Sequence, residues 1–322
     1  MTPEQALFCL HDRLPRNAPG SERSTLAALR KLGRLPAGLR VVDLGCGSGS
    51  STLTLARKLR TPVVAVDAFA PFLESLVERA RAEGLAEWIE PRHADFSKLE
   101  GLEASFDLLW SEGAAFALGF ERALELWRPL LVPGGWAALT ELSWVVPQPV
   151  EPALGYWSRA YPKMQTQEQN CEAARRAGFD VLETFALPEK DWKNYYGPLR
   201  QRIKSLRHQD TVPELLGAVL DEAEKEIDVF RHHVSQFGCI FYLLRRRDQS
   251  DRASDAGVAD ALRTELSLTE PPPFDPTVAA VDRQAHAKLE KRFCEAAADI
   301  GLGRAERLLQ EMSARVRDLS TR

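Results

Sequence analysis

The amino-acid sequence predicts an α/β fold in which a largely parallel β-sheet is covered by helices. Over roughly the first 145 residues, strand and helix patterns alternate along the chain, which is typical of parallel strands joined by crossover helices. The first strong strand, residues 40–44, is a short β-branched run that ends at a cluster of glycines. A buried parallel strand followed by a glycine loop and a helix is therefore the predicted starting unit.

The helix after the glycines is expected at residues 50–59, where Leu53, Ala56 and Leu59 recur at helical spacing. Short apolar runs predict the other strands of this half, and apolar residues spaced by three or four predict its helices. The expected strands are residues 62–66, 88–92, 106–110 and 136–142, the expected helices are 71–83 and 120–131, and Pro133-Gly134-Gly135 is a turn.

The alternation stops after residue 142. Residues 143–166 interleave aromatic residues with prolines and predict no regular element, while residues 167–177 predict a helix and 179–186 a strand. Residues 188–236 carry two helical patterns, and Gly238–Leu244 reads as a final strand. We expect 143–166 and 188–236 to form lid segments over the ends of the strands, where open α/β sheets bind ligands.

A polar linker at residues 249–257 predicts a boundary, with one domain at 1–248 and a helical C-terminal extension at 249–322. In the extension, apolar residues from Val281 to Phe293 recur every three or four positions. Such a stripe must be buried against another surface. The candidate surfaces are the first domain, the second helix of the extension and another subunit of a homodimer.

Composition and charge narrow the class of function. The 322 residues include 44% hydrophobic and 27% charged residues, with a net charge of −4. This balance argues against nucleic-acid binding, which usually requires a basic face. Five scattered cysteines without a CxxC pair, and no clustered ligand pattern, predict neither a disulfide framework nor a bound metal. No apolar run approaches the roughly 20 residues of a membrane span, so a cytoplasmic location without membrane association is expected.

The glycine loop carries the first functional signal. Gly45, Gly47 and Gly49 form a GxGxG pattern at the exit of the first strand, where backbone N–H groups approach an anionic ligand group beside a helix N-terminus. Dinucleotide-binding folds carry a related loop with GxGxxG spacing. Here Ser50 occupies the position of that third glycine, which disfavours an NAD-dependent oxidoreductase.

Three aspartates follow in order along the predicted sheet edge. Asp43 precedes the first glycine by two residues, where a carboxylate suits a ligand with a cationic amino group. Asp67 ends the second strand and is placed to accept both ribose hydroxyls. Asp95 comes after the third strand, within reach of an adenine amino group. Each aspartate taken singly also fits a helix cap or a turn.

With these motifs the chain resembles class I S-adenosylmethionine-dependent methyltransferases, and within them a bacterial small-molecule type. The resemblance extends over roughly residues 20–246. It is carried by Asp43–Gly49, Val66-Asp67, Ala94-Asp95-Phe96 and Leu131–Gly135, and by Gly20–Thr25, Trp110–Ala114, Gly119–Glu121 and the stretch from Leu187 to Tyr196.

The resemblance implies a Rossmann-like, seven-stranded sheet whose last strand is antiparallel between its neighbours. It also implies S-adenosylmethionine as the cofactor, with the methionine moiety on the glycine loop, the ribose on Asp67 and the adenine at Asp95. The expected cofactor-binding residues are Asp43, Gly45, Cys46, Gly47, Gly49, Asp67, Ala68, Asp95, Phe96 and Ser111.

The methyl-transfer chemistry points to one candidate catalytic residue. The sulfonium methyl is already activated, so the protein mainly orients the nucleophile and removes its proton where needed. Glu112 follows the fourth strand and is the candidate general base or contact for a cationic acceptor. The alternative, equally weighted, is that Glu112 binds backbone amides at the following helix. An Asn/Asp-Pro-Pro-Tyr/Phe sequence, typical of enzymes that methylate the exocyclic amines of bases, is absent here.

Aromatic residues concentrate in the two expected lid segments. They are candidates for a substrate pocket that holds a sulfonium or ammonium group by cation–π attraction. The alternative is that they pack the lid onto the domain. The candidates are Trp144, Tyr156, Trp157, Tyr161, Trp192, Tyr195 and Tyr196.

The segment Gly20–Thr25 precedes a helix expected at residues 25–32, with Ser21 or Ser24 as its cap. In the resembling enzymes such a segment folds over the cofactor, which makes Glu22 or Arg23 candidates for closing the site. The predicted activity is methylation of an O, N or C centre of a small molecule. Methylation of RNA or protein, and a non-catalytic module that binds S-adenosylmethionine, are the competing functions.

Overall fold

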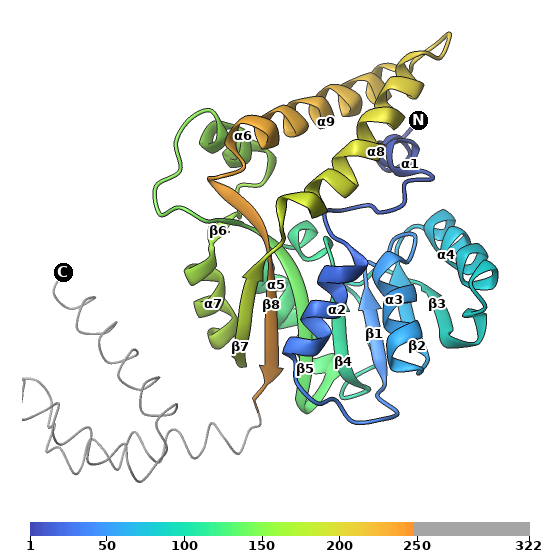
Figure 1. Cartoon of the computed structure of the whole chain (residues 1–322), viewed down its shortest axis with the longest axis vertical. Coiled ribbons are helices and arrows are strands. Elements are labelled where there is room, and N and C mark those ends of the chain that lie inside the picture. Colours follow the sequence, from blue (N-terminus) through green and yellow to red (C-terminus); the bar gives the residue numbers. More distant parts are fainter. Residues whose placement is uncertain (248–322) are drawn as a thin grey trace, which may run out of the picture. The chain divides into compact units, whose positions relative to one another are not determined.

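The computed structural model describes residues 1–247, which belong to one compact unit, Met1–Asp248. Figure 1 shows a central sheet with helices on both faces and a group of helices above one end. The expected C-terminal extension, with its candidate dimer surface, lies outside the described residues.

The sheet has the strand order β3-β2-β1-β4-β5-β8-β7. The first five strands are parallel to their neighbours, and β8 runs antiparallel between β5 and β7. This confirms the expected Rossmann-like sheet with an antiparallel last strand. An additional two-residue strand, β6, pairs with the end of β5. The strands are β1 (Val41–Leu44), β2 (Val63–Asp67), β3 (Ile89–His93), β4 (Phe106–Ser111), β5 (Leu131–Trp144), β6 (Gln165–Thr166), β7 (Phe179–Ala186) and β8 (Phe237–Arg246).

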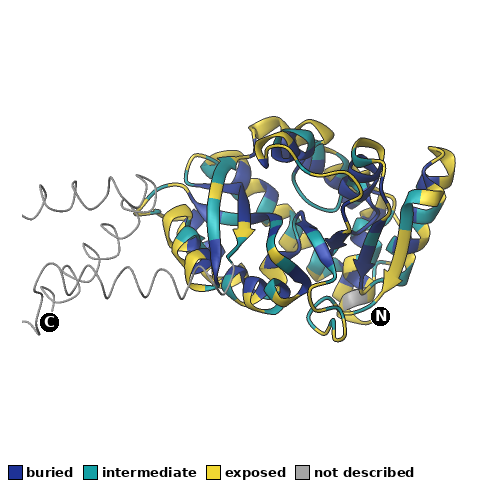
Figure 2. Ribbon diagram, turned by 90° about the horizontal axis from the view of Figure 1, so that it is seen from below, coloured by how far each residue is buried: buried dark blue, intermediate teal, exposed yellow. Residues whose placement is uncertain are grey.

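Helices cover both faces of the sheet because strand residues alternate between them. In β1, Val41 packs on the face that carries α2 and α3, whereas Val42 and Leu44 pack on the opposite face beside α5 and α7. Figure 2 shows buried positions concentrated on the strands and on the inner sides of the surrounding helices. The covering helices are α2 (Glu22–Lys31), α3 (Ser50–Leu59), α4 (Ala70–Ala82), α5 (Phe120–Trp127) and α7 (Gln167–Arg176).

A second group of helices gathers above the carboxyl ends of the parallel strands (Figure 1). Helices α8 and α9 form the two helical patterns expected within residues 188–236, and α1 packs against both of them. None of the helices within residues 1–247 has the length and apolar character needed to cross a membrane. The group consists of α1 (Pro3–His11), α6 (Ala153–Ala160), α8 (Glu189–Arg207) and α9 (Glu214–His233).

Three local expectations differ from the structure. Residues 143–166 are not wholly irregular, because α6 forms where Tyr156 and Trp157 are buried against the core. The turn expected at residues 133–135 is a register shift inside β5, between the pairs Phe106–Leu131 and Leu108–Trp136. Helix α5 ends at Trp127 and a short 3-10 turn over Arg128–Leu130 follows, since Pro129 cannot continue the helix.

Candidate cofactor and active site

The glycine loop joins β1 to α3 in the conformation that its sequence requires. Gly45 and Gly47 have φ angles of +70° and +53°, a region that residues with a Cβ rarely adopt. The amides of Gly45 and Cys46 both donate to the carbonyl of Val66, which ties the loop to β2. Gly49 also has a positive φ, of +86°, and a side chain there would collide with Leu76.

A pocket of about 220 Å³ opens beside this loop. Its walls come from N-terminal residues 16–18 and from the segments that follow β1, β2, β3 and β4, at the edge where open α/β sheets bind ligands. Of the expected cofactor residues, the pocket is lined by Gly45, Cys46, Gly47, Asp67 and Phe96, and the candidate catalytic residue Glu112 also faces it.

Asp67 is held rigidly at the end of β2. One carboxylate oxygen accepts from the amide of Gly47 at 2.8 Å and the other from the amide of Phe69 at 2.9 Å. Burial raises the pKa of Asp67, and these amides oppose the shift. A carboxylate has about four lone-pair positions, so each oxygen retains capacity for one more donor, as a ribose diol would require.

Asp43 lies behind the loop rather than in the pocket wall. It is fully buried and accepts from the hydroxyls of Ser51 (2.8 Å) and Thr52 (2.7 Å) through one oxygen. Its second oxygen, Oδ1, has no partner. Burial raises the pKa of Asp43 to about 7, helped by repulsion from Glu112 and Asp67. Because Ser51 lines the pocket, its hydroxyl connects Asp43 to whatever occupies the pocket.

Four further expected cofactor residues lie outside this lining. Asp95 is exposed, and its carboxylate accepts from the amide and hydroxyl of Ser97. This is the geometry of a turn residue, the alternative to an adenine contact for Asp95. Ser111 is fully buried and donates to the carbonyl of Leu44 at 2.9 Å. Ala68 is exposed at the outer end of β2, and Gly49 starts α3.

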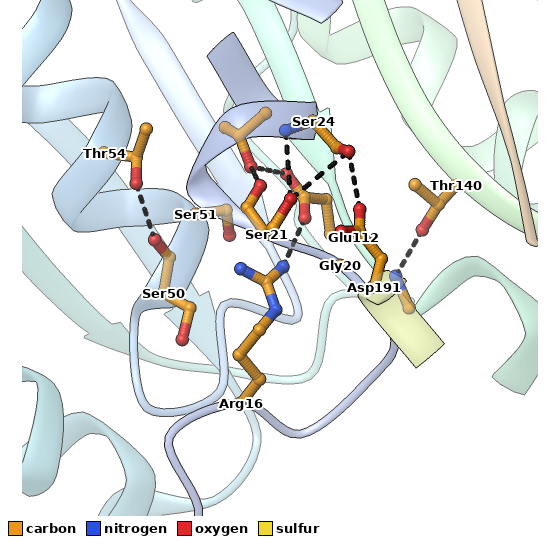
Figure 3. A network of polar contacts seen from close by, with 12 residues as sticks. Arg16, Gly20, Ser21, Ser24, Ser50, Ser51, Thr54, Glu112, Thr140 and Asp191 are labelled. Carbon is orange, nitrogen blue, oxygen red and sulfur yellow. Dashed lines mark hydrogen bonds and ion pairs between the residues drawn. The ribbon is translucent and has the colours of Figure 1, made fainter. Parts of the chain in front are cut away.

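Glu112 is bound by three side chains, and Figure 3 shows one of them, Arg16, directed toward it. Its Oε2 accepts from Arg16 Nη2 at 2.6 Å, and its Oε1 accepts from Thr25 Oγ1 at 2.6 Å and Trp110 Nε1 at 2.9 Å. The Glu112 side chain is 2% exposed and that of Arg16 12%. The expected alternative partners were backbone amides, so the observed partners are of a different kind. The arrangement joins β4 to the N-terminal region.

The pocket has an N-terminal wall that motif reasoning did not identify. We call residues 15–20 the N-terminal strap. The Pro15 carbonyl accepts from Ser50 Oγ at 2.6 Å and Asn17 Oδ1 accepts from Ser48 Oγ at 3.0 Å. Arg16, Asn17 and Ala18 line the pocket, together with Phe72 and Phe116 elsewhere in the chain.

The strap continues into α2 with the predicted cap. The Ser21 side chain accepts from the amide of Ser24, so the helix begins at Glu22 rather than at Thr25. Ser24 in turn donates to Asp191 of α8 at 2.5 Å, which links α2 to the helices above the sheet. Glu22 and Arg23, the candidates for closing the site, are exposed, and Glu22 pairs with Arg57 on the surface.

The seven lid aromatics are buried in one hydrophobic cluster, and within the described chain none of them lines the pocket beside the glycine loop. Trp192 stacks on Phe230 at 5.0 Å between ring centroids, and Trp157 meets Phe237 edge-on at 5.2 Å. The first contact joins α8 to α9, and the second packs α6 onto β8. Tyr161 contacts the pocket lining through Phe116, because the two ring centroids are 6.1 Å apart.

The described residues hold no group of three or more His, Cys, Asp or Glu side chains placed to bind a metal ion. Cys46 lines the pocket as a free thiol, and burial raises its pKa well above the ordinary value. We therefore expect the Cys46 side chain to shape the pocket wall and not to act as a nucleophile.

Comparison with known proteins identifies the domain that surrounds this pocket. Residues 41–135 match a family described as a methyltransferase domain. A dimethylglycine N-methyltransferase of Parasynechococcus marenigrum is 36% identical over 132 residues, which are 38% of this chain and 45% of that protein. Methyltransferase GfsG of Streptomyces halstedii is 30% identical over 126 residues, 39% of this chain and 45% of that protein. The chain thus spans about half the length of these curated relatives.

A solved structure supports the same fold. The crystal structure of an S-adenosylmethionine-dependent methyltransferase from Geobacter sulfurreducens, in complex with S-adenosylhomocysteine, superposes with a TM-score of 0.64 at 23% identity. It covers 76% of this chain and 98% of its own length. With the sheet order, the glycine loop and the matched family, residues 41–135 of this chain form a methyltransferase domain of the class I, Rossmann-like type.

Proposed function

We propose that this chain transfers a methyl group from S-adenosylmethionine to an O, N or C centre of a small-molecule acceptor. The observation that carries the proposal is the pocket between the glycine loop, Asp67 and Glu112, at the carboxyl ends of β1, β2 and β4. Two unpartnered buried donors of lining residues, Arg16 Nε and Asn17 Nδ2, fit the carboxylate of an amino-acid group.

The lining residues divide the pocket into regions that match the parts of the cofactor. Phe72 and Phe96 offer apolar faces for the adenine, and Asp67 offers acceptors for the ribose. The glycine loop leaves room for the amino-acid end, close to Arg16 and Asn17. When bound, the cofactor supplies an activated methyl group, and the chain then orients the acceptor and excludes water.

The acceptor end lies at the segment after β4 that contributes Ala114, Phe116 and Ala117 to the lining. Phe116 is 52% exposed although it lines the pocket, so its ring is placed to contact an incoming acceptor. Glu112 already accepts from three donors, which leaves little capacity to take a proton. We propose that Glu112 holds Arg16 in place at the pocket rather than acting as the base.

Calorimetric titration tests the cofactor assignment. Wild-type protein should bind S-adenosylhomocysteine and not NADH. Gly45→Ala should abolish binding, because the new Cβ would meet Ala114 at a backbone position with positive φ. Gly197→Ala is the matched control, since Gly197 lies in α8 with open space around it and should leave affinity unchanged. Binding of NADH alone would refute the proposal.

Mass spectrometry of acceptor pools tests the reaction. Amino-acid-derived amines come first, because one relative is named a dimethylglycine N-methyltransferase. A methylated small molecule supports the proposal. Methylation of bulk RNA or protein instead would favour the macromolecular alternative, and cofactor binding without any product would favour a non-catalytic binding module.

We propose a reducing, cytoplasmic setting for this activity, with a small molecule as the partner and neither nucleic acid nor membrane involved. The described cysteines, Cys9, Cys46, Cys171 and Cys239, are free thiols, which supports a reducing compartment. Fractionation of cells that express the full chain tests this assignment, and recovery with membranes would contradict it.

A further inference from the structure

Glu141 of β5 is a buried carboxyl that no cation balances within residues 1–247. The residue is 2% exposed, its Oε1 accepts from the amide of Leu142 at 3.0 Å, and its Oε2 has no hydrogen-bond partner. Burial raises the pKa of Glu141 to about 8, and the groups that oppose the shift, the Tyr161 hydroxyl and the Leu142 amide, are both uncharged. Buried charges in proteins are normally paired, so this carboxyl lacks a partner of its own.

The hydroxyl of Tyr161 is a second buried group without a hydrogen-bond partner. Tyr161 directly follows α6 and is 7% exposed. Burial raises the pKa of Tyr161, and the Glu141 carboxyl raises it further, which shows that the two groups lie close together. Unpartnered buried polar atoms are rare, and a ligand group that supplies the missing charge would account for both of them.

The 3-10 helix η2 (Ala115–Ala117) connects this pair of side chains to the acceptor end of the pocket. It packs against β5, and its residues Phe116 and Ala117 line the pocket. The ring of Tyr161 meets that of Phe116 edge-on, with 6.1 Å between their centroids. Phe116 therefore contacts the pocket and Tyr161 at the same time.

Glycines flank η2 on both sides. Gly113 and Gly119 have φ angles of +75° and +85°, which glycine adopts without strain. A few residues at the ends of a segment are enough to absorb the φ and ψ changes of a hinge. Phe116, between the two glycines, is 52% exposed. A change of conformation at these glycines would move Phe116 and open the pocket toward Glu141 and Tyr161.

We propose that Glu141 and Tyr161 select an acceptor that carries an alkylammonium group. The proposal rests on the proposed function and names the substrate class of that reaction. The carboxylate of Glu141 balances the charge of the cation, and the rings of Tyr161 and Phe116 contact its alkyl groups by cation–π attraction. Glu141 and Tyr161 act in recognition and not in proton transfer, so a quaternary ammonium group, which has no proton to give, should also bind.

A cationic probe and its neutral isostere test this selectivity. Choline and dimethylbutanol, in which carbon replaces the nitrogen, have the same shape, but only choline is charged. Each is titrated into the full chain saturated with S-adenosylhomocysteine, at a pH above the pKa of Glu141, and saturation-transfer NMR measures the dissociation constants. Wild type should bind choline about tenfold or more tightly than dimethylbutanol, the effect of one charge-assisted contact.

Two variants separate the charge from the ring. Glu141→Gln keeps the shape of the side chain and removes its charge, so the preference for choline should fall to about twofold or less. Tyr161→Leu removes a ring face and should weaken choline about threefold or more, while dimethylbutanol changes less than about twofold. Neither side chain lines the cofactor pocket, so the affinity for S-adenosylhomocysteine should be unchanged in both variants and reports that they are folded.

Glu226→Gln is the matched control. Glu226 of α9 accepts from the Tyr196 hydroxyl at 2.7 Å, and burial raises its pKa as it does for Glu141. It does not line the pocket, and α9 contributes no residue to the lining. This variant should keep the wild-type preference for choline. Loss of the preference in Glu226→Gln would overturn the proposal, since the effect would not be local.

Failure of the ammonium site and failure of the proposed function give different results. Wild type that binds S-adenosylhomocysteine but does not prefer choline, or binds neither probe, overturns the ammonium site and leaves the proposed function intact. A preference that persists in Glu141→Gln does the same. If Glu141→Gln does not fold, unchanged choline affinity in Tyr161→Leu overturns the site. Wild type that does not bind S-adenosylhomocysteine overturns the proposed function and this inference with it.

Discussion

The buried carboxyl of Asp43 is expected to make cofactor binding depend on pH near neutrality. Burial places its pKa at about 7, so in the unliganded protein at this pH the carboxyl is about half protonated. A ligand ammonium group that binds Ser51 Oγ would favour the ionised form, because Ser51 donates to Asp43 at 2.8 Å. Binding should therefore expel the proton.

The size of the effect follows from the two pKa values. If binding returns the pKa of Asp43 toward its ordinary 3.8, the affinity for S-adenosylhomocysteine should fall about tenfold between pH 8 and pH 6, and about half a proton should be released per ligand at pH 7. Asp43→Asn cannot ionise and should bind with an affinity that is flat over this range. Methylthioadenosine lacks the ammonium group and should also show a flat profile.

Calorimetry in buffers of different ionisation enthalpy measures the released proton directly. The dependence of the observed binding enthalpy on the buffer should be large for wild type and near zero for Asp43→Asn. Proton release that persists in Asp43→Asn would refute the assignment and point to another group. Release that is equally large with methylthioadenosine would show that the ligand ammonium is not the cause.

Three other perturbations test the site and the packing around it. Asp67→Ala should weaken the binding of S-adenosylhomocysteine by about 1.5–3 kcal/mol for each charge-assisted hydrogen bond to the ribose that the substitution removes. It should also lower the free energy of unfolding, because the amides of Gly47 and Phe69 lose their acceptor. Unchanged affinity with lowered stability would confine Asp67 to a role in loop structure. Glu141→Gln should remove a pH dependence of stability. Burial raises the pKa of Glu141 to about 8 from 4.5, so between these pH values the folded form stays protonated while the unfolded form ionises. In urea unfolding, the free energy of unfolding of wild type should therefore fall by about 1.4 kcal/mol per pH unit as the pH rises through this range. A wild-type slope equal to that of the variant would contradict the raised pKa. Trp192→Ala should lower the free energy of unfolding by about 3–5 kcal/mol, because Trp192 is buried against Phe230 and Tyr196. The affinity for S-adenosylhomocysteine should stay within twofold of wild type. A stable variant without turnover would instead place Trp192 at the acceptor.

Local periodicity predicted the regular elements well where one face of each is buried. Helix α3 spans Ser50–Leu59 and strand β7 spans Phe179–Ala186, the ranges that the apolar patterns indicate. In α3 the pattern reports which positions face the core, because residues 51–56 are buried there. Helix α1 was not predicted because its burial depends on α8 and α9, which are distant in sequence. Arg202 of α8, for example, donates to the carbonyl of Cys9, 193 residues away.

The residues of the candidate site also divide into those that the sequence predicts and those that it does not. The glycine loop and Asp67 were predictable, because a strand end and its loop are contiguous in sequence and each residue type there has a backbone reason. The partners of Glu112 were not, since Arg16 lies 96 residues away and Thr25 lies 87 residues away. Aromatic residues in a lid segment are equally compatible with a pocket wall and with packing. Only the contacts of Trp157 and Trp192 with Phe237 show that these two rings pack the upper helices onto β8.

The two carboxyl groups near the amino-acid end of the pocket differ in partners, and this difference assigns them different roles. Asp43 is buried with two hydroxyl donors and no cation, so a ligand ammonium supplies the missing positive charge. Glu112 is buried with a guanidinium and two further donors, so its charge is already balanced within the protein. A zwitterion placed between them meets an unbalanced acid behind Ser51 and the unused donors of Arg16 and Asn17 on the strap. The pocket is therefore complementary to both ends of an amino-acid group, and removing either partner should weaken binding through a different charge of the same ligand.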